Sequence, residues 1–181
     1  MKETIKLGVI LLIITAVSAG VLAVSNNLTK DKIAQIEMEG SLGAITELFE
    51  SADKFEELDQ AELSAIIDSN PTVVEIFEAY EGDDVTGYAI KTIAGGFGGD
   101  VVMVTGFSKD GNITGIRLLE HSETAGIGSR AGEPEFTDLF IDKPADEEVV
   151  VEALSGATIT SKAVILGVNN AREVFNTQLA N

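Results

Sequence analysis

Residues 101–120 read VVMVTGFSKDGNITGIRLLE, an apolar run followed by a turn and a second apolar run. The first run continues from Val101 to Phe107. Residues 109–112 contain Asp-Gly, which is a strong short-range signal for a tight hairpin turn. The chain then returns from Ile113 to Glu120. This pattern predicts two antiparallel strands joined by a hairpin.

The same alternation of strand and turn precedes this hairpin. Residues 73–80 and 85–93 are rich in β-branched and aromatic residues, and Glu81-Gly82-Asp83-Asp84 separates them. Short turns join neighbouring antiparallel strands, whereas parallel strands need long crossovers. We therefore expect an antiparallel sheet of at least four strands.

Helical spacing replaces the strand pattern near both ends of this sheet. At the C-terminal side, apolar residues recur at intervals of four, three, four and four: Val164, Val168, Ala171, Phe175 and Leu179. Thr160 or Ser161 is the expected N-cap of this helix. At the other side, residues 41–49 have helical spacing, and the acidic stretch 53–68 is expected to contain a short helix. The sequence predicts an α+β fold with an antiparallel sheet packed against helices.

Residues 7–29 form a run of 23 residues without a charge. About 20 apolar residues cross a bilayer as a helix, and a secretory signal has a shorter apolar core of roughly 7–15 residues. A transmembrane helix is therefore expected, with a cleaved signal as the alternative because Ala23-Val24-Ser25 resembles a cleavage site. The expected organisation is a tail at 1–6, a span at 7–29, a helical membrane-proximal segment at 30–72 and a C-terminal domain at 73–181.

Composition excludes several classes of function. The 181 residues include 12 basic and 30 acidic ones, a net charge of −18, which argues against binding to nucleic acid. The chain has no cysteine, so disulfides, thiolate metal sites and iron–sulfur clusters are excluded. It has one histidine, His121. We expect no catalytic residue and no metal ligand in this chain. Any redox chemistry would therefore require an organic cofactor.

Small and hydroxyl residues gather just before the predicted C-terminal helix, at Ser155-Gly156-Ala157-Thr158-Ile159-Thr160. Free N–H groups and the positive end of the helix dipole favour a phosphate at such a position. Gly156 and Ala157 allow a bulky group to approach the backbone, and the hydroxyls offer ligands or acceptors for phosphate. The alternative interpretation is an ordinary capped helix start.

Two motifs resemble those of a known family. Ser155-Gly156-Ala157-Thr158 resembles the flavinylation motif of proteins that carry FMN through a phosphoester to the last threonine, here Thr158. Glu152 stands where that family usually has an aspartate, six positions before the threonine. Residues 121–128, HSETAGIG, resemble the family's loop His-x-Glu-Thr-Pro-Gly-Leu-Gly. With the N-terminal span, the chain resembles the G subunits of Rnf-type electron-transport complexes.

The resemblance implies a covalent FMN as the cofactor, on Thr158, with the second motif close to the flavin. Glu123 and Thr124 would supply polar contacts, and Gly126 and Gly128 would allow close backbone approach. The remaining binding residues that it implies are His121, Ile127, Ser155, Gly156, Ala157 and Thr160. His121 taken by itself is more often a surface or strand-end histidine than a catalytic base.

The function implied is electron transfer within a membrane complex that couples ferredoxin:NAD⁺ oxidoreduction to Na⁺ or H⁺ translocation. The implied partners are the other subunits, a flavin transferase for maturation, and the membrane. We expect a single-pass protein of the cytoplasmic membrane with its C-terminal domain on the outer face. No complete enzymatic activity is expected from this chain alone. Two alternatives are a stand-alone anchored flavoprotein for extracellular electron transfer and a non-redox anchored binding domain.

Overall fold

The computed structural model describes residues 2–180, and the chain divides into two compact units between Gly40 and Ser41. Helix α1 (Lys2–Leu48) contributes to both units. Every described residue up to Gly40 is exposed. Within residues 2–180, α1 is the one helix that is long and apolar enough to cross a membrane. It contains the predicted span 7–29 and remains helical through the predicted helical stretch beyond residue 41.

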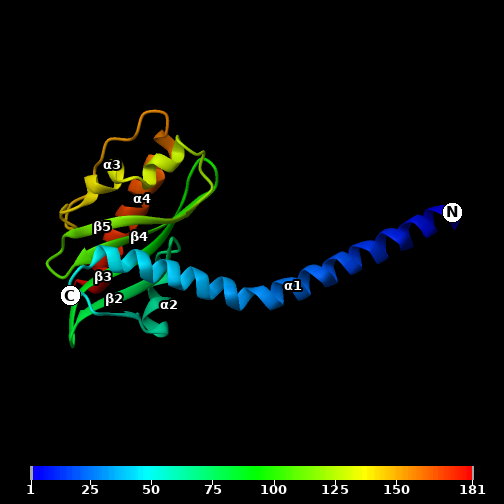
Figure 1. The fold of residues 1–181 in the computed structure, drawn as a ribbon, viewed down its shortest axis with the longest axis horizontal. Helices are drawn as coiled ribbons and strands as arrows, with labels where there is room; N and C mark the ends of the chain where they lie inside the picture. Colours follow the sequence, from blue (N-terminus) through cyan, green and yellow to red (C-terminus); the bar gives the residue numbers. More distant parts are fainter. Residues whose placement is uncertain (1, 181) are drawn as a thin grey trace. The chain divides into compact units, whose positions relative to one another are not determined.

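The second unit begins at Ser41. Its described residues, up to residue 180, hold a five-stranded antiparallel sheet in the order β1-β2-β3-β4-β5 (Figure 1). Each strand pairs with the next one along the chain. The strands are β1 (Lys54–Glu57), β2 (Val73–Glu81), β3 (Asp84–Gly95), β4 (Asp100–Ser108) and β5 (Ile113–His121). The predicted hairpin turn joins β4 to β5, and Gly111 there has φ +83°, a conformation that favours glycine. The expected α+β fold is confirmed.

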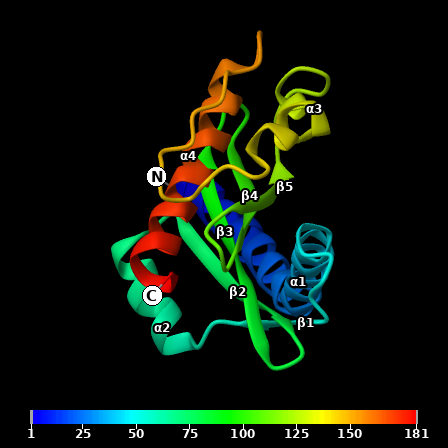
Figure 2. The ribbon, with the colours of Figure 1, turned by 90° about the vertical axis from the view of Figure 1, so that its left-hand side faces the viewer.

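The remaining elements are short, apart from one helix. Helix α2 lies between β1 and β2, and the others follow β5. Their bounds are α2 (Gln60–Ser69), η1 (Gly128–Gly132), α3 (Pro134–Thr137), η2 (Asp138–Phe140), α4 (Thr158–Val174) and η3 (Phe175–Leu179). Figure 2 shows α4 and α2 on one face of the sheet and the last turns of α1 on the other.

Helix α4 covers the sheet through the apolar face that the sequence predicts. Val164, Val168 and Ala171 are fully buried in the main core, together with Met103 of β4. Contact is close at Gly167, where an added Cβ would lie 2.6 Å from the Met103 sulfur. At the far end, the Phe175 ring stacks on Phe107 with centroids 4.8 Å apart. These contacts fix α4 along its length.

The direction of α4 places its first residue beside the loop between β3 and β4. The Thr92 hydroxyl donates a hydrogen bond to Gly167 O at 3.3 Å, and the Phe175 ring meets the Tyr88 ring with centroids 6.1 Å apart. Earlier residues of α4 therefore lie beside later residues of β3, so the helix and the strand run in opposite directions. The N-terminus of α4 consequently reaches the end of β3, next to residues 96–99.

The last turn of α1 packs on the opposite face of the sheet, where the strands carry glycines. A Cβ on Gly87 would lie 2.5 Å from Phe49 Cε1, and one on Gly106 would lie 3.2 Å from Phe49 Cε2. A Cβ on Gly115 would lie 2.9 Å from Leu48 Cδ2. Three neighbouring strands thus leave space for Phe49 and Leu48, so the end of α1 belongs to the core of the second unit.

A buried lysine strengthens the same attachment. Lys91 of β3 is only 7% exposed, and its Nζ donates to Ser41 Oγ at 3.3 Å. The same ammonium pairs with Glu75 Oε2 at 3.1 Å. A charge this far from water is stable only with such partners. Residues 41–72 accordingly fold in one compact unit with residues 73–180.

Two local expectations need correction. Strand β1 lies inside the acidic stretch for which only a helix was predicted, because Phe55 is its one inward-facing side chain and gives no alternation. The N-cap of α4 is Ala157, and neither Thr160 nor Ser161. Both hydroxyl residues lie inside the first turn, where Ser161 Oγ donates back to Ala157 O at 2.9 Å.

Phe49→Ala should destabilise the second unit by about 3–5 kcal/mol, because loss of the ring leaves a cavity beside Gly87 and Gly106, which have no side chains of their own. Pulse proteolysis of the detergent-solubilised chain across a urea series measures this change. Val150→Ala is the matched control, since Val150 is 76% exposed, and it should change stability by less than about 0.5 kcal/mol. Equal urea midpoints for the two variants would contradict the proposed packing role of Phe49.

Candidate functional site

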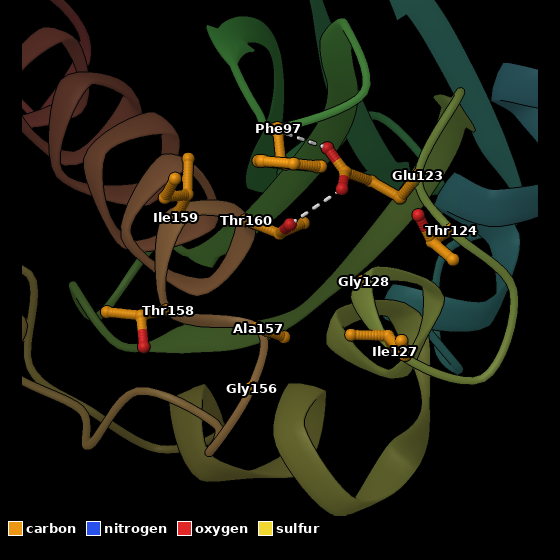
Figure 3. Close-up of a pocket in the computed structure, with 10 residues that line it drawn as sticks. All are labelled: Phe97, Glu123, Thr124, Ile127, Gly128, Gly156, Ala157, Thr158, Ile159 and Thr160. Atoms are coloured by element: carbon orange, nitrogen blue, oxygen red, sulfur yellow. Dashed lines mark hydrogen bonds between the residues drawn. The ribbon is translucent and has the colours of Figure 1, made fainter.

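A pocket of about 410 Å³ opens where α4 begins (Figure 3). Three segments enclose it: the β3–β4 loop, the loop after β5, and the turn that leads into α4. The lining residues are Phe97, Glu123, Thr124, Ile127, Gly128, Gly156, Ala157, Thr158, Ile159 and Thr160. Three of them are large apolar side chains that remain exposed, namely Phe97 at 70%, Ile127 at 50% and Ile159 at 54%. The pocket therefore offers apolar surface to a ligand.

The N-terminus of α4 supplies the polar side of the pocket. Ser161 N donates to Ala157 O at 2.9 Å, which is the first hydrogen bond of the helix. The N–H groups of Thr158, Ile159 and Thr160 precede that bond, so no helical carbonyl is available to them. Ala157 gives no side-chain cap. These N–H groups and the helix dipole favour an anionic group at Thr158.

The turn before α4 lets the backbone reach the pocket. Gly156 has φ +82°, a conformation that residues with a Cβ rarely adopt, and an added Cβ there would meet no atom within 4 Å. Leu154 O accepts from Ala157 N at 3.0 Å, which closes the turn. The Leu154 N–H in turn donates to Ser161 Oγ at 3.1 Å. Ser161 therefore holds the turn against the helix from inside.

Glu123 joins the three segments of the pocket through one carboxylate. Its Oε1 accepts hydrogen bonds from Phe97 N at 2.7 Å and Gly98 N at 3.0 Å. Its Oε2 accepts from the Thr160 hydroxyl at 2.7 Å. Hydrogen bonds to an ionised acceptor are about twice as strong as neutral ones. The carboxylate thus ties the β3–β4 loop to the first turn of α4.

Glycines make this arrangement possible. A Cβ on Gly128 would lie 2.5 Å from Glu123 Oε2 and 2.9 Å from Glu123 Cβ. A Cβ on Gly96 would overlap Glu123 Oε1, and one on Gly98 would overlap the Ser122 carbonyl. The segments on either side of Glu123 can therefore approach it only because they lack side chains.

The hydrogen bonds also set the ionisation of Glu123. Partial desolvation by its surroundings raises the pKa of this carboxyl. The bonds from Gly98 N, the Thr160 hydroxyl and Phe97 N lower it, as does the nearby His121. The lowering contributions prevail, so the pKa of Glu123 lies below its ordinary value of 4.5. Glu123 is therefore an anion at neutral pH and acts only as an acceptor.

The pocket brings together eight of the eleven residues that the sequence analysis selected, and the other three lie outside its lining. His121 ends β5 and accepts a hydrogen bond from Glu123 N at its Nδ1, over 3.4 Å. Gly126 donates from its N–H to Ser129 Oγ at 2.9 Å within the loop. Ser155 is exposed in the turn before α4.

Two lining residues are not predicted from the sequence, namely Phe97 and Ile159. Phe97 lies among four glycines, a pattern that reads as a flexible bend. Ile159 directly follows the flavinylation-like motif and has no polar group that would mark it as a ligand contact. Their common signal is a large apolar side chain in a segment of small and polar residues.

Two family models match this chain. The model of the FMN-binding domain family matches residues 96–173, which include every lining residue of the pocket, and that of the RnfG N-terminal region matches residues 1–48. The crystal structure of the C subunit of the Na⁺-translocating NADH-quinone reductase from Parabacteroides distasonis has a similar fold. It is 18% identical, with a TM-score of 0.54 over 72% of this chain and 79% of that one.

Two curated relatives are similar over almost their whole length. The G subunit of the Na⁺-translocating ferredoxin:NAD⁺ oxidoreductase complex of Acetobacterium woodii is 34% identical over 96% of this chain and 92% of its own. The G subunit of the ion-translocating oxidoreductase complex of Methanosarcina acetivorans is 32% identical over 98% of this chain and 97% of its own.

The fold and the matched region define an FMN-binding domain that follows an N-terminal apolar helix. The pocket suits such a cofactor, because it combines exposed apolar side chains for a flat ring with free helical N–H groups for a phosphate. The chain belongs to the family of G subunits of Rnf-type ion-translocating oxidoreductase complexes.

The ionised Glu123 should stabilise the second unit in a pH-dependent way. Because its pKa is lower in the folded chain than in the unfolded one, its contribution is present above pH 4.5 and is lost as the pH falls through the folded value. Glu123→Gln should therefore lower the free energy of unfolding more at pH 7 than at pH 3. Urea unfolding of both chains at the two pH values measures the difference, and an equal loss at both would contradict it.

Proposed function

We propose that this chain carries FMN as a phosphoester on Thr158 and transfers electrons as a subunit of a membrane complex. The proposal rests on a difference in exposure and position among four neighbouring hydroxyl groups. Thr158 is exposed and lines the pocket, whereas Ser155 is exposed but lies outside the lining. Thr160 is 1% exposed and bonded to Glu123, and Ser161 is fully buried. Thr158 alone of the four is both exposed and part of the pocket lining.

The pocket residues would then have distinct tasks. The free N–H groups at the start of α4 would hold the phosphate, with the helix dipole favouring its charge. Ile127 and Ile159 would provide apolar contact and keep water from the ring. A bound flavin accepts two electrons and can pass them on one at a time. The protein's contribution is to hold, orient and shield the cofactor.

The names of the relatives support a proposal for the activity of the whole complex. Two of them belong to ferredoxin:NAD⁺ oxidoreductase complexes, one Na⁺-translocating in Acetobacterium woodii and one proton-translocating in Clostridium ljungdahlii. We extend ferredoxin:NAD⁺ oxidoreduction coupled to ion translocation to the complex of this chain, without a choice of ion. Its partners would be the other subunits and, during maturation, a flavin transferase.

Thr158→Ala should abolish covalent FMN. Intact-mass spectrometry of the full chain, expressed together with a flavin transferase, should show a gain of one FMN less one water in the wild type and no gain in the variant. Thr177→Ala is the matched control, because Thr177 is an exposed hydroxyl residue outside both motifs and outside the pocket lining, and it should keep the added mass. An unmodified wild type beside a transferase that modifies another substrate would refute the assignment.

We also propose that residues 7–29 span the membrane, with the N-terminus in the cytoplasm and the flavin domain on the outer face. The chain has no cysteine, so one introduced cysteine is its single thiol. Val150→Cys should react with a membrane-impermeant maleimide in intact cells, because Val150 is 76% exposed. Glu3→Cys should react only after permeabilisation, and the reverse pattern would invert the topology.

A further inference from the structure

Phe97 is an exposed aromatic residue in an otherwise side-chain-free loop. The loop between β3 and β4 reads Gly95-Gly96-Phe97-Gly98-Gly99, and Phe97 is 70% exposed. In Figure 3 its ring extends over the pocket from the side opposite Ile127. Leaving an aromatic ring in water forgoes the burial free energy that such side chains usually contribute. This cost is recovered when a ligand covers the ring.

The backbone of this loop is held in place by contacts on both sides of Phe97. The Phe97 and Gly98 N–H groups both donate to Glu123 Oε1. The Gly96 N–H donates to Gly99 O at 2.8 Å, which closes the loop on itself. The absence of a Cβ at Gly96 and Gly98 allows the loop to lie against Glu123 and Ser122. The glycines therefore permit close packing here, and the loop has a defined position.

Glu123 has no oxygen left without a protein donor. Its Oε1 receives two N–H groups and its Oε2 receives the Thr160 hydroxyl, which is itself almost fully buried. Both acceptor sites of Oε1 are taken, so a ligand donor could reach only the second acceptor site of Oε2. The carboxylate is therefore better suited to hold the site together than to contact the cofactor.

We propose that the Phe97 ring packs against the ring system of the bound flavin, and that Glu123 is the positioning residue that holds Phe97 there. The inference rests on the proposed function, because it takes FMN as the occupant of the pocket. It differs from the polar contact to the flavin that the sequence motif implies for Glu123. Phe97 becomes a contact residue, and Glu123 acts through it.

The experiment measures how accessible the flavin is to a quencher. The full chain is loaded with FMN by the transferase, its loading is confirmed by intact mass, and flavin fluorescence is quenched with acrylamide. A neutral quencher is needed because the chain has a net charge of −18. Pockets bury about 70–90% of a ligand's surface, so removing one wall should raise the quenching constant by about two- to threefold. Phe97→Ala should give this increase.

Val150→Ala is the matched control, since it removes an equally exposed apolar side chain outside the pocket lining. Its quenching constant should equal that of the wild type. A loaded Phe97→Ala protein with an unchanged constant would overturn the contact between Phe97 and the flavin.

The role of Glu123 is tested by non-additivity. Glu123→Ala should raise the quenching constant as Phe97→Ala does, and the double variant should show no further increase, because both changes remove the same wall. Glu123→Gln retains an acceptor for the two loop N–H groups and should stay close to the wild type. An additional increase in the double variant would overturn the positioning role.

A second route leaves the carboxylate intact in case Glu123→Ala fails to fold. Gly98→Ala introduces a Cβ that would overlap the Ser122 carbonyl, which displaces the loop from Glu123. It should raise the quenching constant to the level of Phe97→Ala, and an unchanged constant would overturn the proposal. A wild-type chain without FMN mass would contradict the proposed function itself, and the mass spectrum reports this before any quenching is measured.

Discussion

The site depends on one carboxylate that holds three segments far apart in the sequence. Glu123 accepts hydrogen bonds from residues 97 and 98 on one side and from residue 160 on the other. Each bond to a charged group contributes about 1.5–3 kcal/mol, but only while the carboxylate is ionised and its neighbours fit closely. The glycines at 96 and 128 follow from this requirement, because any side chain there would occupy the space of the carboxylate.

The hydrogen bond from Thr160 can form only because the core fixes α4 in the right place. Gly167 allows the helix to lie against Met103, and Phe175 anchors its far end on Phe107. The helix therefore reaches the β3–β4 loop with its uncapped N-terminus facing the pocket. Helix α4 thus links the packing of the core to the geometry of the site, because its first turn carries Thr158, Ile159 and Thr160.

The elements that the sequence predicts well are those with a local signal. The turn at Asp110-Gly111 and the spacing from Val164 to Leu179 both appear in the structure. Strand β1 has no such signal, because its pairing with β2 depends on tertiary context and only Phe55 faces inward. The N-cap of α4 was misassigned because Thr160 and Ser161 have preferred cap side chains that the structure uses inside the helix.

The candidate site was predictable where a motif marked it, and less so where geometry alone defines it. Thr158, Glu123 and Gly128 stand in recognisable motifs, and all three line the pocket. Phe97 does not, because its importance depends on the neighbouring glycines and on a carboxylate 26 residues away. The space for Phe49 beside Gly87 and Gly106 is similarly not evident in the sequence, since it arises only when β3 and β4 are aligned.

The exposure of Thr158 bears on the order of maturation. Thr160 and Ser161 are enclosed once α4 has packed on the sheet, so their hydroxyls would be accessible only before folding. Thr158 keeps its hydroxyl at the surface of the finished domain. Under the proposed attachment, the modifying enzyme can act on a chain that is already folded. The fold then leaves one of the neighbouring hydroxyls accessible, and cofactor loading can follow folding.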